Sequence, residues 1–450
     1  MVINGKITAF SDENIDKKLY ADLWKEFSFH GSAIKIVKGE SLCFSCGKAA
    51  NVALSDGDEF AFYVTDDGFA VKGADSNRLR RGINALMARI ERNGNGTTIP
   101  NGEVRGRFTS DFRAVHFCVF PETTLFELDR FLRAAAVTCY THAVVEFWGT
   151  LRYDSLRWLG FKNAFTKREV KKVFGTARSL GLEIIPFFNH LGHASQCRVT
   201  SGKHVVMDQK PEYARLFTPD GWAYDIGSEE VKNLLRNVRR ELCELCGEGK
   251  YFHIGCDEPY IYDLGYGSHE KVNAYVADRA REVIDEGRLP IIWSDLLVPA
   301  RFKDCYEIEK YTPTESDEKR VDDFAAILPK GTVLADWWYE IERSPVPTCE
   351  RLKKYGFEII GCPWETFGNI RAYHKTDGLK GVMLTTWHTL YRNYANLLIN
   401  ARLFGYPHNR WSEFAPARTE TARILRAVKK PEKYERAGFC NRQITKDFTQ

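Results

Sequence analysis

Two neighbouring carboxylates, Asp257 and Glu258, follow an apolar run in the segment Tyr251-Phe-His-Ile-Gly-Cys-Asp-Glu-Pro. The run predicts a buried strand that brings both side chains to its carboxyl end, where Pro259 ends the hydrogen-bonding ladder. Two acids this close repel each other and can titrate as a coupled pair with one raised pKa. A raised pKa suits a group that donates a proton near neutral pH. Such dipeptides often lie on solvated turns, but the apolar residues before this pair favour a site.

Strand-like runs alternate with helix-like segments from about residue 108 onward, and this alternation organises the chain around the acid pair. It predicts a (β/α)8 barrel, with an open doubly wound sheet as the alternative. Polar and aromatic residues cluster just after the strand ends, where a barrel builds its active site, and this favours the barrel. The eight strand-like runs are residues 114–120, 143–147, 182–188, 251–255, 290–293, 332–337, 357–361 and 381–387.

The residues before the barrel predict a small α+β domain. Two short β-rich runs, 60–64 and 69–73, flank an Asp-Gly turn, and a helix with one apolar face follows from Ser76. The stretch from Asn93 to Gly102 is dense in turn-forming residues and predicts a linker or hairpin loop. We therefore expect an N-terminal domain over residues 1–107, a catalytic barrel over 108–410 and a helical tail packed on the barrel over 411–450.

Composition excludes several classes of protein. Sixty-four basic residues nearly balance 60 acidic ones, and no block of Lys and Arg is long enough for a nucleic-acid arm, so we expect no nucleic-acid partner. No apolar run approaches the roughly 18 residues of a membrane span. The chain shows no secretory signal and has 12 cysteines, many in apolar runs, which favours a cytoplasmic enzyme. The pairs Cys43/Cys46 and Cys243/Cys246 fall in different predicted domains, so we expect them to bind neither a metal nor a cofactor.

The segment His253-Ile-Gly-Cys-Asp-Glu resembles the His-x-Gly-x-Asp-Glu signature of glycoside hydrolase family 20, and is most similar to its branch containing hexosaminidase D. Residues 58–90 resemble the small domain that precedes the barrel in this family. Four later segments match in order: Ile185-Pro-Phe-Phe-Asn-His-Leu-Gly-His193, Ile292-Trp-Ser-Asp295, Ala335-Asp-Trp-Trp-Tyr339 and Gly381-Val-Met-Leu-Thr-Thr-Trp387. The resemblance implies a small domain followed by a TIM barrel.

The resemblance also implies an activity, that of an exo-acting β-N-acetylhexosaminidase. Glu258 would protonate the glycosidic oxygen, and the 2-acetamido oxygen of the substrate would attack. This route gives an oxazoline-type intermediate and net retention. Asp257 would hold the acetamido N–H. The partner would be a glycan or glycoconjugate with terminal β-linked GalNAc or GlcNAc, and the enzyme, a monomer or a homodimer, would need no cofactor or metal.

Other positions are expected to bind the sugar. Tyr339 is a candidate donor to the acetamido carbonyl, and His253 would support the acid pair. Each of these residues could instead have a structural role: His253 as a hydrogen-bonded histidine of the core, the tryptophans as core residues, and Arg113 as part of a structural ion pair. The full set of expected substrate-binding residues is Arg113, Glu146, His193, Trp293, Trp338, Tyr339 and Trp387.

The sequence departs from the classical family pattern at two strand ends. Glu146 stands where classical members carry an Asp-Asp segment, and Trp387-His388-Thr389 replaces their Trp-x-Glu. The residues that grip sugar hydroxyls therefore differ, and the choice between GlcNAc and GalNAc stays open.

Parts of the sequence would also fit two other functions. A metal-dependent barrel hydrolase would use His190, His193, His253 and Asp257. A carbohydrate-binding relative without catalysis would not need an adjacent acid pair, and the presence of both Asp257 and Glu258 argues against it.

Overall fold

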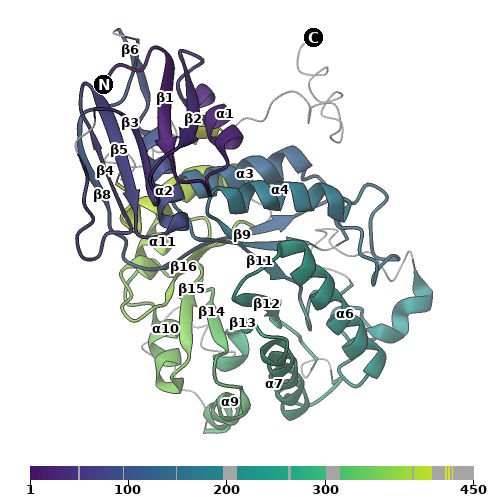
Figure 1. Ribbon diagram of the computed structural model, residues 1–450. Coiled ribbons are helices and arrows are strands. Elements are labelled where there is room, and N and C mark those ends of the chain that lie inside the picture. The colour runs from purple at the N-terminus through teal and green to yellow at the C-terminus, as the bar shows by residue number, and fades with distance from the viewer. Residues whose placement is uncertain are drawn as a thin grey trace, which may run out of the picture.

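The computed structural model describes residues 1–48, 51–94, 96–147, 149–195, 210–261, 265–299, 315–387 and 390–407, with five further positions between 421 and 428. Two bodies follow one another along the chain, a sheet with two helices and a larger barrel (Figure 1). The predicted tail over 411–450 lies almost entirely outside the described residues, as do His388 and Thr389.

The N-terminal domain is a six-stranded sheet in the order β2-β1-β3-β5-β4-β8. Gly82 lies on α2 so close to the sheet that a Cβ there would come within 2.8 Å of Val71 Cγ1. The turn-rich stretch after residue 90 forms a small hairpin of β6 (Glu91–Asn93) and β7 (Gly96–Thr98). The other elements are β1 (Gly5–Ser11), α1 (Lys17–Phe27), β2 (Ser32–Lys38), β3 (Cys43–Gly47), β4 (Phe60–Val64), β5 (Gly68–Gly73), α2 (Ser76–Ala88) and β8 (Gly102–Gly106).

The second body is a closed barrel of eight parallel strands, because β16 pairs with β9. The predicted (β/α)8 barrel behind a small α+β domain is confirmed, and the open sheet is excluded. Its strands are β9 (Phe112–Val119), β10 (His142–Phe147), β11 (Glu183–Phe187), β12 (Tyr251–Gly255), β13 (Leu289–Trp293), β14 (Val333–Asp336), β15 (Glu358–Gly361) and β16 (Gly381–Leu384).

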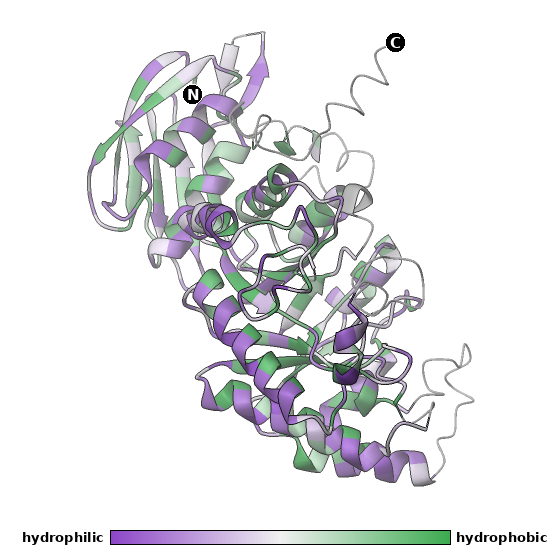
Figure 2. Cartoon of the chain, turned by 90° about the vertical axis from the view of Figure 1, so that its right-hand side faces the viewer, coloured by the Kyte–Doolittle hydropathy of each residue, from purple (hydrophilic) through white to green (hydrophobic). Residues whose placement is uncertain are grey.

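Helices surround the barrel, and α3, α4, α6, α7 and α11 each begin after a Ser or Thr whose side chain accepts a backbone N–H of the first turn. Thr124 and Thr166 each form a capping box, in which the threonine and a glutamate three residues later satisfy each other's backbone N–H groups. In Figure 2 the helices carry both hydrophilic and hydrophobic residues, the pattern of helices that cover a core. The helices are α3 (Leu125–Val137), α4 (Lys167–Ser179), η1 (Pro211–Leu216), α6 (Glu229–Cys246), α7 (His269–Asp285), η2 (Asp295–Leu297), α9 (Glu315–Ile327), α10 (Pro347–Leu352), η4 (Lys353–Tyr355), α11 (Phe367–His374) and α12 (Leu390–Leu403).

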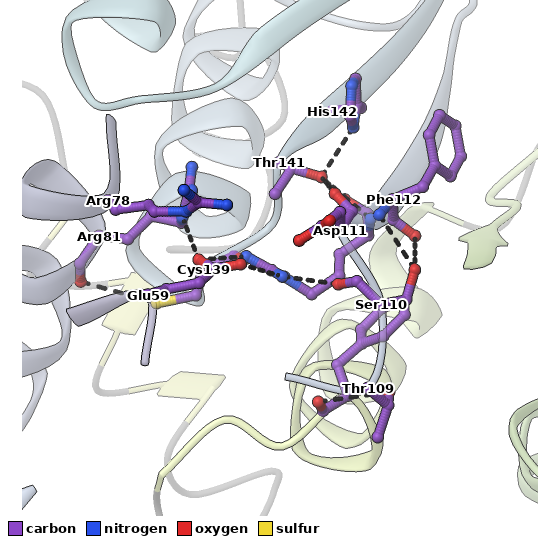
Figure 3. Close-up of polar contacts among 12 residues, drawn as sticks. Glu59, Arg78, Arg81, Thr109, Ser110, Asp111, Phe112, Cys139, Thr141 and His142 are labelled. Carbon is purple, nitrogen blue, oxygen red and sulfur yellow. Dashed lines mark hydrogen bonds and ion pairs between the residues drawn. The ribbon is translucent and has the colours of Figure 1, made fainter. Parts of the chain in front are cut away.

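A buried ion-pair network joins the two bodies at the amino end of the barrel strands. Glu59 lies between Arg81 of α2 and Arg113 of β9. Figure 3 labels Glu59, Arg81 and Cys139 among the polar contacts of this region. Arg113 donates to both carboxylate oxygens of Glu59, at 2.7 and 3.0 Å, and Arg81 donates to one of them at 2.9 Å. Arg113 is only 1% exposed, and its Nε donates to the carbonyl of Cys139. One carboxylate therefore balances two buried guanidinium groups from different domains.

We expect Glu59→Gln to destabilise the fold by about 3 kcal/mol or more, because it leaves two buried arginines without a compensating charge. Unfolding in urea, followed by circular dichroism, measures the loss. The matched control is Glu13→Gln, whose partner Lys38 is 73% exposed and whose own side chain is 67% exposed. This change should move the midpoint little. Equal midpoints for the two variants would contradict the interpretation.

The same network predicts a pH dependence. Burial alone would raise the pKa of Glu59, but the hydrogen bonds and charges of Arg113 and Arg81 outweigh it and lower the pKa. The stabilisation is therefore fully present above the unfolded glutamate pKa, about 4.3, and is lost as pH falls through the lowered folded pKa. The urea midpoint of the wild type should decrease as the pH is lowered through this range. The midpoint of Glu59→Gln should depend less on pH over the same range.

Candidate active site

The acid pair lies on a strained turn directly after β12. The backbone φ is positive at Gly255 (66°), Cys256 (70°), Glu258 (43°) and Tyr260 (48°). Residues other than glycine rarely adopt this conformation, and it costs of order 1–3 kcal/mol each, so surrounding contacts must hold it. Strain of this kind is concentrated at functional sites, which makes this turn the first candidate.

Asp257 is a buried carboxylate with both oxygens engaged. Its side chain is 9% exposed. Asn189 Nδ2 donates to Oδ1 at 2.7 Å, and His193 Nε2 lies 3.2 Å from Oδ2. Burial alone would raise the pKa of Asp257, but the charge and hydrogen bond of His193, together with the Asn189 bond, outweigh it and lower the pKa. The geometry therefore stabilises the ionised form of Asp257.

Glu258 has a fixed backbone and an accessible carboxyl group. Its N–H donates to Asp295 Oδ2 at 2.9 Å, and its carbonyl accepts from Trp222 Nε1 at 2.6 Å. Its side chain is 34% exposed, and Oε2 lies 3.4 Å from His193 Nε2. Two segments far apart in the sequence thus hold the peptide on both sides, while the carboxyl group can still meet a substrate.

His193 lies between the two carboxylates and contacts both. Its φ is 55°, and its ring centroid lies 4.5 Å from that of Trp222. The preceding residue must be glycine, because a Cβ on Gly192 would overlap the carbonyl oxygen of Asp257. The loop after β11 therefore packs directly on the turn after β12 and brings the imidazole to the acid pair.

Aromatic side chains from later strand ends assemble beside one another. Trp387 Nε1 donates to the hydroxyl of Tyr339 at 2.8 Å. Burial raises the pKa of Tyr339 well above its usual value, and the charge of Asp257 acts in the same direction, so the phenol keeps its proton. The rings of Trp293 and Trp387 have centroids 5.6 Å apart. The structure thus brings together Trp293, Tyr339 and Trp387.

Two predicted residues lie in the barrel interior. Glu146 is buried, and His116 Nε2 lies 3.3 Å from its Oε2. His253 stacks on Phe187 with centroids 4.2 Å apart. Its Nδ1 accepts the N–H of Gly255 at 3.0 Å, and burial lowers its pKa to about 3. His253 is therefore a neutral residue that supports the turn, and its proton lies on Nε2.

Arg113 is not part of this cluster. It is the second residue of β9, at the amino end of the barrel strands, whereas Asp257 follows the carboxyl end of β12. Its guanidinium is committed to Glu59. The expectation that Arg113 binds substrate is corrected, and its structural alternative, the ion pair, is what the structure shows.

Trp338 is also placed differently from the expectation. It packs in the hydrophobic cluster shared with the outer helices, and its backbone N–H donates to the hydroxyl of Tyr373 at 2.7 Å. The neighbouring Trp337 packs against the cluster inside the barrel. Side chains of successive extended residues point to opposite faces, so only one of the two tryptophans can face inward. The inward residue is Trp337.

Three residues that contact the acid pair were given no role from the sequence: Asn189, Trp222 and Asp295. Asn189 and Asp295 are polar residues just after apolar strands, and this signal was available. Trp222 lies in the long excursion between β11 and α6, and its direction could not be read from the sequence.

The metal-binding alternative is assembled only in part. His190 is buried, with its ring nitrogens against the carbonyl of Phe188 and the guanidinium of Arg239. His253 supports the turn, so neither of these histidines joins the predicted set. His193, Asp257 and Glu258 do offer ligand atoms within 4.8 Å of one another, a spacing that suits a metal ion.

The two Cys-x-x-Cys pairs consist of free thiols, and burial raises the pKa of all four cysteines. In the part of the chain that the structure describes, no helix is both long enough and apolar enough to cross a bilayer.

Comparison with known proteins identifies relatives of the chain. Residues 149–425 match the model of the glycosyl hydrolase family 20 catalytic domain. Hexosaminidase D from Bos taurus is 24% identical over 168 residues, which are 34% of this chain and 46% of that protein. The match thus spans less than half the length of this curated relative.

Solved structures share the fold. An N-acetyl-β-hexosaminidase from Streptomyces plicatus, in complex with thio-NAglucal, has a TM-score of 0.66 at 14% identity and covers 94% of this chain and 91% of its own. A β-N-acetylhexosaminidase from Bacteroides fragilis has a TM-score of 0.66 at 15% identity, covering 95% and 93%. The family model spans more than half of the chain and includes β12 and the turn that carries Asp257 and Glu258. The chain therefore belongs to glycosyl hydrolase family 20 and is a glycoside hydrolase.

Proposed function

We propose that this glycoside hydrolase is an exo-acting β-N-acetylhexosaminidase that releases terminal β-linked GlcNAc or GalNAc. The observation that carries the proposal is the unlike environment of two adjacent carboxyl groups. Asp257 is buried and stabilised as an anion, whereas Glu258 is one-third exposed on a fixed backbone. A neighbouring anion and an accessible acid are the two groups that substrate-assisted hydrolysis needs.

The proposed first step divides the work among three side chains. Glu258 donates its proton to the glycosidic oxygen as the bond from that oxygen to C1 breaks. The acetamido oxygen of the substrate forms a new bond to C1 and gives an oxazoline-type intermediate. Asp257 accepts the acetamido N–H, and Tyr339 donates its O–H to the acetamido oxygen. In the second step Glu258 takes a proton from water, and the water oxygen bonds to C1 as the C1–O bond of the oxazoline breaks, which restores the acetamido group and gives net retention.

The burial of Asp257 supports this route over direct attack by a carboxylate. A carboxylate nucleophile must reach the anomeric carbon from the face opposite the acid, with the two groups about 5–5.5 Å apart. Asp257 instead follows the same strand as Glu258, and both its oxygens already accept hydrogen bonds. These contacts suit a group that orients and stabilises a developing charge better than one that forms a covalent bond.

The relatives support the substrate class, since the similar structures from Streptomyces plicatus and Bacteroides fragilis are N-acetylhexosaminidases by name. Trp293, Trp337 and Trp387 are proposed to pack against the acetamido methyl group and the sugar ring, since indoles suit both surfaces.

The described cysteines are free and most are buried, which supports a reducing, cytoplasmic location.

We expect Glu258→Gln to lower kcat by about 10²–10⁴ on substrates with poor leaving groups, because general acid assistance is lost. Aryl glycosides with good leaving groups need less protonation and should lose less, which makes them the internal control. Asp257→Asn should impair N-acetylated substrates with both kinds of leaving group. Steady-state rates measure these effects, and unchanged turnover in Glu258→Gln would overturn the assignment.

Trp222→Phe should lower kcat/KM about fivefold, the effect of losing one hydrogen bond worth about 1 kcal/mol. The substitution removes the donor to the Glu258 carbonyl and keeps an aromatic ring against His193. The matched control is Trp158→Phe. It is the same substitution at a tryptophan that also packs on an aromatic ring, that of Tyr213, with centroids 4.3 Å apart. Equal rates in the two variants would show that the Trp222 bond does not position the acid.

Chelation separates the proposal from a metal-dependent hydrolase. We expect full activity after treatment with a chelator, because no step in the proposed mechanism passes through a metal. Activity that is lost and then restored by Zn²⁺ would favour the alternative.

Rates on aryl β-glycosides of GlcNAc, GalNAc, glucose and galactose, measured in the same assay, should show that the acetamido group is required.

A further inference from the structure

Asn189 bridges the buried carboxylate and the turn that carries it. It lies two residues after β11, and its side chain reaches the turn after β12. Its Nδ2 donates to Asp257 Oδ1 at 2.7 Å, and its Oδ1 accepts from the N–H of Cys256 at 2.9 Å. The same oxygen lies 3.4 Å from the N–H of Leu191. One carboxamide thus contacts both the backbone and the functional oxygen of the turn.

The direction of this carboxamide is determined by its partners. Two backbone N–H groups face Oδ1, so the oxygen must lie on their side and the NH₂ group must face Asp257. The opposite orientation would bring an oxygen against a carboxylate and an NH₂ group against two donors. Since an amide does not titrate, this bond to Asp257 is available at every working pH.

The fit around Asn189 is close. A Cβ on Gly255 would lie 2.6 Å from both Cγ and Oδ1 of Asn189, tighter than real contacts allow. The glycine therefore provides the space that the carboxamide occupies, in addition to its positive φ of 66°. The close approach leaves Asn189 little freedom to rotate away from Asp257.

Asp257 also experiences several titratable neighbours, and Asn189 differs from all of them. His193 can gain or lose charge as pH changes, whereas the carboxamide donates the same hydrogen bond throughout. That bond lowers the pKa of Asp257, alongside the larger effect of His193 and against the effect of burial. The titratable groups that contact Asp257 or interact with its charge are His193 on the loop after β11, Cys256 and Glu258 on its own turn, His253 of β12 and Tyr339 after β14.

We propose that Asn189 is a positioning residue that holds Asp257 ionised and oriented to accept the acetamido N–H of the substrate. The inference rests on the proposed function and adds a residue to it. Asn189 need not touch the sugar, because it acts through Oδ1 of Asp257 and through the N–H of Cys256.

The decisive variant is Asn189→Asp, which keeps the shape and the acceptor for Cys256 but replaces the donor with a carboxylate oxygen. Two carboxylate oxygens about 2.7 Å apart must share a proton, which raises the pKa of the pair. On an aryl β-GlcNAc substrate, the acid limb of the kcat profile should move up by about one pH unit or more. At pH values below the shifted limb, kcat of the variant should be at least about tenfold lower than that of the wild type, while KM changes little.

Asn369→Asp is the matched control. Asn369 is also buried, and its carboxamide donates to the carbonyls of Trp338 and Ile341 and accepts from the N–H of Trp364. Its replacement should lower the thermal midpoint without moving the acid limb. The shift in pH profile, and not the loss of stability, is therefore the readout specific to Asn189.

Asn189→Ala is the second variant and decides the test if Asn189→Asp does not fold. It removes the donor without adding a charge, so kcat should fall at least about fivefold with a smaller upward shift of the acid limb. Suppose that the wild type is active on N-acetylated substrates. If the folded variants then keep kcat within twofold of the wild type and their acid limb does not move, this inference alone is overturned. A wild type inactive on N-acetylated substrates would overturn the proposed function, and this inference with it.

Discussion

The need to keep one carboxylate charged in a buried position organises this site. An isolated anion at the position of Asp257 would be expensive, so the surrounding segments must supply hydrogen bonds and positive charge. Asn189 and His193 do so from the loop after β11, and the β12 turn brings the carboxylate to them. The glycines at 192 and 255 permit the close contact between these two loops. Catalytic geometry here therefore depends on the fit of one loop against the next.

The barrel provides what this fit requires. Parallel strands bring every loop after a strand to the same end, so residues from β11, β12, β13 and β14 meet although up to 150 positions separate them, from Asn189 to Tyr339. The interior residues His116, Glu146, His253 and Phe187 fill the space beneath the turn with rings and one buried acid. Rigid support below and loop contact above together hold backbone angles that would otherwise relax.

The barrel and the acid pair could be predicted because they depend on local pattern. Apolar runs with helical segments between them indicated the strands, and a characteristic signature marked Asp257 and Glu258. Side-chain direction was the harder problem. The first strand was predicted to begin at residue 114 and begins at Phe112, which places Arg113 inside it at the end away from the pair. The last strand was predicted to reach Trp387 and ends at Leu384, so Trp387 lies in a loop with φ of 41°.

Contacts that depend on two distant segments left weaker signals. The choice between Trp337 and Trp338 requires knowing where β14 ends, and the role of Asn189 requires knowing which loop faces it. Asn189 and Asp295 are polar residues that follow apolar strands, a signal that could have marked them, but only the packing of neighbouring loops shows which backbone group each one meets.

The network around Glu59 has a consequence for dissecting the protein. Arg113 belongs to the first barrel strand, yet the acid that neutralises it precedes β4 in the N-terminal domain. A barrel expressed without that domain would retain an arginine aimed at a surface that no longer supplies its counter-charge, and Phe108 would lose the cover of the adjacent sheet. The N-terminal domain therefore acts as part of the barrel's interior chemistry, and a minimal catalytic fragment has to begin upstream of the barrel itself.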